Sequence, residues 1–290
     1  MKRLTMVVAA AVAAVLALPS PGFAAGTTFS RKPLAVGTRV EERGLMQMTM
    51  SMKVEAAGKA QEVSMDLSER EVKSQEYLAL EGDAPSKVRT TWQEKTSVAK
   101  ENGVEKPKPS ELAGKTFVVE AQKNAPPAVA AADGQPLSEA VVAEVQKEHR
   151  SLGKPDPVRA AMPARALSPG QKVPELAKAV TDALSRDNDD GMKISNVSVT
   201  FKGATGDEGR FDVTLRMAKA EGPVAMTIDL KGELKVSCAS SLPNSLKLAG
   251  PIAVKPAPGG PKGLAISGKG QMSMELSEVV QGPAGAEATP

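Results

Sequence analysis

The sequence contains very few of the residues on which most catalytic centres and stacking sites depend. Its 290 residues include one cysteine, one histidine, one tryptophan, one tyrosine and five phenylalanines. A lone cysteine cannot form an internal disulfide, and zinc sites built from cysteine and histidine clusters are excluded. Platforms that stack sugars or nucleic-acid bases use aromatic faces, for which this chain has little material.

The single cysteine and the single histidine both fall on apolar faces of predicted elements. Cys238 follows the apolar parity of a predicted strand, so a buried and inert thiol is expected rather than a reactive one. His149 lies on the apolar stripe of a predicted helix, which favours a packed side chain over a catalytic one. The acidic turn 187–190 lacks the ligand spacing of a calcium loop. We therefore expect no enzyme, no cofactor and no metal site.

The first residues predict an export signal. Lys2 and Arg3 precede an apolar run over residues 6–18 that is short for a membrane span. Cleavage is expected after Ala24, and no cysteine follows it to carry a lipid anchor. The remaining chain is expected to be soluble, periplasmic or extracellular, with no integral membrane segment. At the other end, residues 282–290 are expected to form a disordered tail.

The charges are mixed and almost balanced. The formal net charge is +3, and loss of Lys2 and Arg3 with the signal lowers it to +1. Like-charged blocks that mark polybasic or acidic tails are absent from the sequence. A nearly neutral chain without a basic patch is not expected to bind nucleic acid.

A strict alternation of apolar and polar residues is the strongest pattern in the chain. Residues 45–54 place four methionines on one parity and polar side chains on the other, and residues 271–276 repeat the theme. Alternation of this kind predicts β-strands with one apolar face. Methionine adapts to varied apolar shapes, so this face is a candidate site for a hydrophobic ligand; the alternative is a plain core filled by methionine. The candidate residues are Met46, Met48, Met50, Met52, Met226, Ile228, Met272 and Met274.

The order of the patterns predicts one α+β domain over residues 25–281, mainly antiparallel β. Long curved amphipathic strands are expected to form a half-barrel or open barrel, with Gly232, Gly268 and Gly270 as bend or bulge points. A two-helix insert is expected within residues 134–187, with helices at about 138–152 and 174–186. Residues 106–109 are interpreted as a stiff connector, 124–132 as a loop and 154–170 as an extended segment.

The arrangement of long alternating strands around a small helical insert resembles the periplasmic lipoprotein-carrier type. It also looks like uncharacterised bacterial exported β-rich proteins that carry the stretches found here at residues 114–119 and 169–173. The resemblance implies a curved antiparallel half-barrel whose helices cover an apolar concave side, and it transfers no catalytic residue. The expected function is a non-catalytic envelope protein that binds a lipid, an acyl chain or another hydrophobic ligand. The alternative is a structural module whose partner is another envelope protein.

Overall fold

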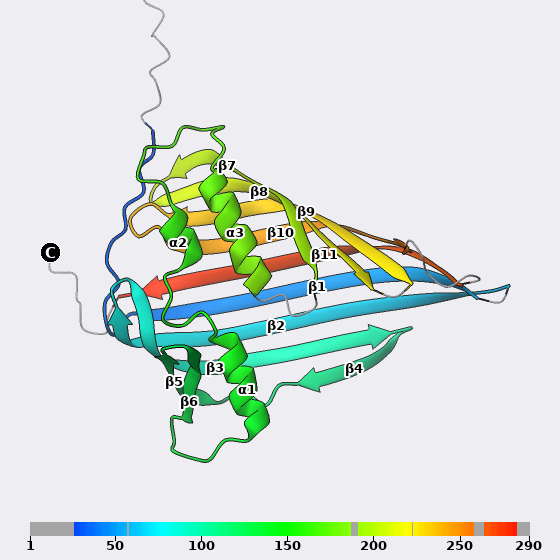
Figure 1. Cartoon of the computed structure of the whole chain (residues 1–290), viewed down its shortest axis with the longest axis horizontal. Coiled ribbons are helices and arrows are strands. Elements are labelled where there is room, and N and C mark those ends of the chain that lie inside the picture. The colour runs from blue at the N-terminus through cyan, green and yellow to red at the C-terminus, as the bar shows by residue number, and fades with distance from the viewer. Residues whose placement is uncertain (1–25, 57, 187–190, 222, 258–263, 283–290) are drawn as a thin grey trace, which may run out of the picture.

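The computed structural model describes residues 26–56, 58–186, 191–221, 223–257 and 264–282. The predicted signal, the acidic turn 187–190 and residues 283–290 of the predicted tail lie outside these ranges. Figure 1 shows a single broad sheet with the helices lying on one of its two faces. We call this helix-bearing side the inner face and the opposite side the outer face.

One open antiparallel sheet of eleven strands forms the framework, which confirms the predicted fold class. Ten strands follow the order β6-β5-β3-β2-β1-β11-β10-β9-β8-β7, and β4 pairs with β3 beside this path. The first and last long strands therefore meet at the centre of the sheet. The strands are β1 (Arg39–Ala56), β2 (Lys59–Glu81), β3 (Ala84–Glu101), β4 (Val104–Pro109), β5 (Thr116–Gln122), β6 (Ala125–Ala131), β7 (Lys193–Thr205), β8 (Glu208–Glu221), β9 (Val224–Ser237), β10 (Pro243–Pro256) and β11 (Leu264–Gln281).

The described residues between β6 and β7 form three helices, so the predicted two-helix insert needs a correction. They are α1 (Glu139–Glu148), α2 (Pro157–Ala161) and α3 (Pro174–Arg186). The short helix α2 lies in the segment that was expected to be extended. Asp156 caps it by accepting a hydrogen bond of 2.7 Å from the backbone N–H of Arg159, and proline is favourable in a first helical turn. These local signals outweigh the proline content of the segment.

Two segments predicted as connector and loop are strands at the margin of the sheet. The strand β4 includes the predicted connector, and β6 lies within the predicted Ala/Pro-rich loop. Of the described strands, β4 pairs only with β3, and β6 pairs only with β5. A marginal strand leaves one edge unpaired, so a proline that lacks an N–H donor is tolerated there. The prolines therefore marked the position of these strands in the sheet rather than their absence.

The buried core is divided into two clusters that lie toward opposite margins of the sheet. The first core cluster packs α2 and α3 against β7 to β10 and includes Leu176, Val180, Phe201, Phe211 and Leu248. The second core cluster packs α1 against β3 and β5 and consists of Val88, Trp92, Leu112, Phe117, Val119, Val141 and Val145. The scarce aromatic side chains are concentrated here: Phe201 contacts Phe211, and Trp92 contacts Phe117. The central strands β2, β1 and β11 lie between the two clusters.

Glycines on the inner face allow neighbouring strands to approach closely. A Cβ atom at Gly232 would overlap the carbonyl oxygen of Lys247 on β10, and one at Gly250 would overlap that of Asp229 on β9. Gly268 and Gly270 on β11 approach the backbone of β1 in the same way. Pairing of β11 with β1 continues without a bulge through both glycines. The sequence predicted bends or bulges at Gly232, Gly268 and Gly270; the structure instead makes these three glycines, together with Gly250, points where strands approach closely.

Replacement of Gly232 by alanine should destabilise the protein, because the new methyl group overlaps a neighbouring backbone. We expect a loss of roughly 1–3 kcal/mol or more in the free energy of unfolding, measured by urea denaturation. Gly44→Ala is the control, since its Cβ would lie 3.4 Å from the Leu276 Cδ2 atom, an ordinary contact. Its stability should change by less than about 1 kcal/mol. Equal stabilities for the two variants would contradict the close approach.

Cys238 lies one residue beyond the end of β9 and is half-buried, not fully buried as the strand pattern suggested. Its side chain packs against the first core cluster. Burial, and then the neighbouring Asp207 carboxylate, raises the pKa of its thiol. Since the thiolate is the reactive form, a thiol reagent at neutral pH should label the native protein at least about tenfold more slowly than the urea-unfolded chain. Equal rates would show that Cys238 is open and unperturbed.

Candidate functional site

The methionines of β1 and β11 form a continuous double row on the inner face. The antiparallel register places Met46 opposite Met274 and Met48 opposite Met272, and it places Met50 and Met52 opposite Gly270 and Gly268. On the other side of β1, strand β2 adds Leu67, Met65 and Val63 at the matching positions. We call Met46, Met48, Met50, Met52, Met272 and Met274 the methionine row.

The candidate residues differ in how deeply they are buried. Every residue of the methionine row is half-buried, and so is Met226, whereas Ile228 is only 2% exposed and belongs to the first core cluster. Met226 and Ile228 lie on β9, which β10 separates from β11. Met46 and Met52 belong to neither core cluster. The sequence-predicted face is thus one surface geometrically, but Ile228 is part of the core.

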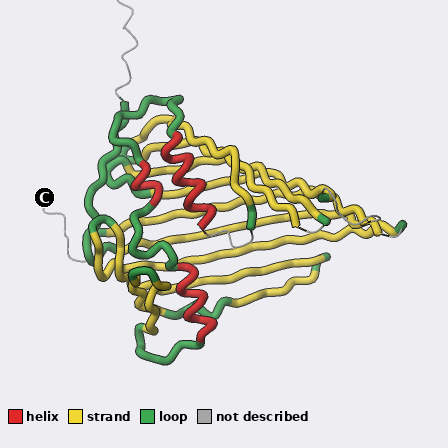
Figure 2. Tube along the Cα trace, viewed as in Figure 1, coloured by secondary structure: helices red, strands yellow, loops and turns green. Residues whose placement is uncertain are grey.

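The helices leave the central strands largely uncovered. Helix α3 packs against β7 and α1 packs against β6, on opposite sides of the sheet order. Figures 1 and 2 show the helices gathered toward one end of the strands, with β1, β2 and β11 extending beyond them. Leu276, which follows Met274 on the inner parity of β11, is 43% exposed. An apolar strip therefore remains open to solvent between the two helical covers.

The methionine row ends in charged residues at the helix-covered end of the sheet. Beyond Gly44 and Leu276, the next inner-face pair is Glu42 opposite Glu278. Lys73 on β2 lies opposite Glu42, and its Nζ atom is 3.0 Å from a carboxylate oxygen of Glu42 and 3.0 Å from one of Glu71. One continuous face thus changes from apolar to charged over two residue pairs.

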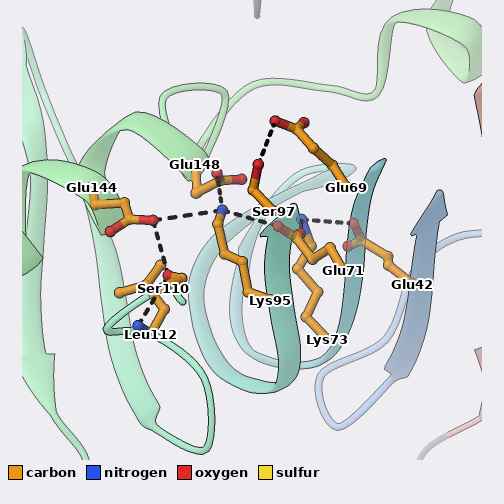
Figure 3. A network of polar contacts seen from close by, with 10 residues as sticks. All are labelled: Glu42, Glu69, Glu71, Lys73, Lys95, Ser97, Ser110, Leu112, Glu144 and Glu148. Atoms are coloured by element: carbon orange, nitrogen blue, oxygen red, sulfur yellow. Dashed lines mark hydrogen bonds and ion pairs between the residues drawn. The ribbon is translucent and has the colours of Figure 1, made fainter. Parts of the chain in front are cut away.

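A network of ion pairs joins this charged end to α1, as Figure 3 shows. Lys95 on β3 bridges Glu71 of the sheet, at 3.0 Å, to Glu148 of α1. Ser110 also donates a hydrogen bond of 3.2 Å to Glu144 of α1. Burial opposes the charge of Lys73, but Glu42 and Glu71 outweigh it and raise the pKa of this lysine well above its usual range. The network therefore stays ionised at neutral pH and fixes α1 over the sheet.

A cavity of about 510 Å³ opens beside this network. Its walls come from β1, β2 and β11 of the sheet, from the end of α1 and from the segment that leads into α2. Glu278 faces it and makes no hydrogen bond or ion pair to any part of the chain that the structure describes. Burial, then Glu42 and Asp156, raises the pKa of the Glu278 carboxyl well above its usual value. Burial, and then the charges of Glu278 and Glu42, raise the pKa of Tyr77.

His149 is packed, as its helical stripe predicted. It is 5% exposed, its ring contacts the Trp92 ring edge-on at 5.7 Å, and its Nε2 atom has no hydrogen-bond partner among the described residues. Burial, and then the positive charge of Lys73, lowers the pKa of the imidazole to about 3. His149 is therefore a neutral wall residue of the cavity at physiological pH.

The outer face carries a second hollow of about 790 Å³, but its chemistry is different. It lies over β1, β8, β9, β10 and β11 and includes the charged side chains of Lys231, Glu233 and Lys247. Lys247 forms a surface ion pair with Glu275. This hollow follows the solvated parity of the strands, so the inner face is the better candidate for an apolar ligand.

The charged end of the site was not identified from the sequence. Glu42 and Glu278 both lie on the apolar parity of their strands, which is an unusual position for an ionisable group. That position was the available signal. Their juxtaposition could not be read from it, because the two residues are far apart in the chain and meet only through the β1–β11 register.

Two further classes of site receive no support from the described residues. Within them, no group of three or more histidine, cysteine, aspartate or glutamate side chains is arranged to hold a metal ion. Within them, too, no helix has the length and apolar character needed to cross a membrane.

No family model and no curated protein matches the sequence. Solved structures match at low similarity. One is lipovitellin, in a structure describing its lipid-protein interactions, with 8% identity and a TM-score of 0.36; the match covers 89% of this chain and 27% of that chain. This chain therefore spans little more than a quarter of that protein.

Two bacterial structures match over most of both chains. A putative outer membrane lipoprotein-sorting protein domain from Vibrio parahaemolyticus has 12% identity and a TM-score of 0.20, with 88% of this chain and 89% of that chain covered. A DUF1329 family protein from Desulfovibrio piger has 8% identity and a TM-score of 0.13, with 87% and 88% covered. At such scores these matches assign neither a family nor a function.

The single histidine provides a direct test of the packing beneath α1. With a native pKa of about 3, His149 should show no titration between pH 5 and 8 when its ring proton is followed by NMR in tag-free protein. Because the unfolded chain binds this proton near pH 6.5, acidification from there toward pH 3 should progressively remove stability. A titration midpoint near 6.5 in the folded protein would show that the imidazole is hydrated.

Proposed function

We propose that the protein is a non-catalytic exported binding protein whose inner face holds the apolar chain of a lipid or another hydrophobic ligand along the methionine row. The observation that supports this most strongly is the half-burial of all six methionines on one continuous face. Methionine side chains are flexible and polarizable, which suits a surface that accommodates a mobile chain. An open apolar strip of this kind is otherwise costly to expose to water.

The dimensions of the row suit an extended acyl chain. From Met52 to Glu42 the strand β1 advances by about 3.3 Å per residue, which gives roughly 33 Å along the face. Gly268 and Gly270 leave the positions opposite Met52 and Met50 without side chains. The side chains of Met50 and Met52 therefore have no side chain opposite them on β11. Among the described residues, apolar side chains and glycines line the row from Met52 to Gly44, and we propose binding without chemistry there.

The second candidate is a structural module in which the same residues act only as core. The packing of Met48, Met50, Met272 and Met274 against the first core cluster favours it. Met46 and Met52 distinguish the two functions, because neither contributes to a core cluster. A ligand-binding face needs them apolar, whereas a core-only role does not.

The replacement of Met46 by aspartate should weaken binding of a fluorescent fatty-acid probe at least about tenfold, because a charge would lie beneath the apolar chain. Met52→Asp should have the same effect. Binding is measured by titration of the probe into folded protein. The strand fold should persist in both variants, because these two side chains are half-buried and outside the core.

Gln47→Asp is the matched control, since Gln47 is exposed on the outer parity of the same strand. It introduces the same charge one residue away and should leave probe affinity within about twofold. If the wild-type protein binds no acyl probe, or if all three variants bind equally, the structural module is the remaining function.

A further inference from the structure

The cavity at the end of the methionine row has one acidic side chain, Glu278, that forms no ion pair with the described residues. We propose that this cavity receives an ammonium head group, so that the ligand of the inner face is a cationic or zwitterionic amphiphile whose amine lies against Glu278 and Glu42. The inference rests on the proposed function, because it assigns the head group of the same ligand. It concerns the polar end of the site, which the apolar row by itself leaves unspecified.

Register is the first argument. Glu278 and Glu42 are direct partners on neighbouring antiparallel strands and point to the same face. Directly opposed side chains have Cβ atoms about 4.5–5.5 Å apart, and like charges in this arrangement repel. A cation placed between the two carboxyls would stabilise the ionised form of Glu278, which burial and the charge of Glu42 disfavour.

The pairing of the surrounding charges is the second argument. Lys73 is held between Glu42 and Glu71, and Glu148 is held by Lys95. Asp83 lies 3.4 Å from a guanidinium nitrogen of Arg159. Glu278 differs from these groups because no described residue forms an ion pair or hydrogen bond with it. The Glu278 carboxyl can therefore accept a hydrogen bond from a bound cation.

The remaining cationic side chains do not fill this position. Lys147 and Arg150 line the cavity and have interactions of their own. Lys154 lines it as well, but its side chain is exposed at the surface, whereas Glu278 is half-buried. The neutral imidazole of His149 adds no positive charge. Burial first, and then the charges of Glu42 and Asp156, raise the pKa of Glu278, and Lys73 only partly opposes this shift.

Continuity with the apolar strip is the third argument. On β11 the residues that follow one another along the inner face are Met272, Met274, Leu276 and then Glu278. Leu276 is 43% exposed, so no part of the described chain closes the strip between the methionines and the cavity. An amphiphile with its chain on the methionine row would therefore place its head group at Glu278.

Three ligands with the same chain test the head-group preference: dodecylammonium, dodecanoate and 1-dodecanol, each below its aggregation limit. Calorimetric titration should give dodecylammonium at least about tenfold tighter binding than dodecanoate, with dodecanol between them. Glu278→Gln should abolish the advantage of dodecylammonium and leave dodecanol affinity unchanged. The fold should be retained, because this carboxyl has no partner to lose among the described residues.

Glu275→Gln is the matched control, since it removes the same charge from the outer face of the same strand, where Glu275 pairs with Lys247. It should keep the full preference for dodecylammonium.

Lysophosphatidylethanolamine and lysophosphatidylglycerol with twelve-carbon chains identify the source of the amine. Tighter binding of the ethanolamine lipid indicates a phospholipid head group near Lys154, and a preference seen only with dodecylammonium indicates a simple amine.

The outcomes separate the two levels of the proposal. Failure of every ligand to bind would overturn the proposed function together with this inference. Binding of dodecanoate or dodecanol as tight as that of dodecylammonium would overturn the ammonium assignment alone and leave the acyl-binding face in place. Loss of the preference in Glu275→Gln as well would show that net charge, and not the cavity, attracts the cation.

Discussion

The antiparallel pairing of β1 with β11 is the constraint on which the rest of the structure depends. It joins strands from the two ends of the described chain over eighteen residue pairs, without a bulge, at the centre of the sheet. A slip of one residue would turn every side chain of one strand to the other face. The same register that aligns Met46 with Met274 also aligns Glu42 with Glu278, so the apolar row and the charged end are consequences of one pairing.

This central pairing also explains why the core is divided. Helices α2 and α3 bury the inner face of β7 to β10, and α1 buries that of β3 and β5, each against its own set of aromatic and aliphatic residues. Lys95 ties α1 to the sheet through Glu71 and Glu148. The methionines of the strands between the two covers therefore lie on an apolar face that is only half-buried. In a chain with so few aromatic residues, methionine supplies most of this central surface.

Alternation along the chain was sufficient to predict the long strands, the mainly antiparallel sheet and the shared face of the methionines. Proline misled the prediction at β4, β6 and α2, because its effect depends on whether an N–H is needed at that position. For β4 and β6, an edge site does not need that donor. Asp156 and Pro157 begin a helix instead of breaking one. The charged end could not be predicted, because it depends on the long-range β1–β11 register, which no local pattern contains. Cys238 is half-buried rather than fully buried, and β9 ends one residue before it.

The central claim is that the methionine row is a ligand surface rather than unfilled core, and the methionine methyl groups report on it directly. In protein labelled with ¹³C at the methionine methyls, addition of dodecylammonium should shift the signals of Met46, Met48, Met50, Met52, Met272 and Met274. The signal of Met162, which is 2% exposed within the first core cluster, should remain in place. Shifts confined to residues outside the row, or no shifts at saturating ligand, would contradict the account.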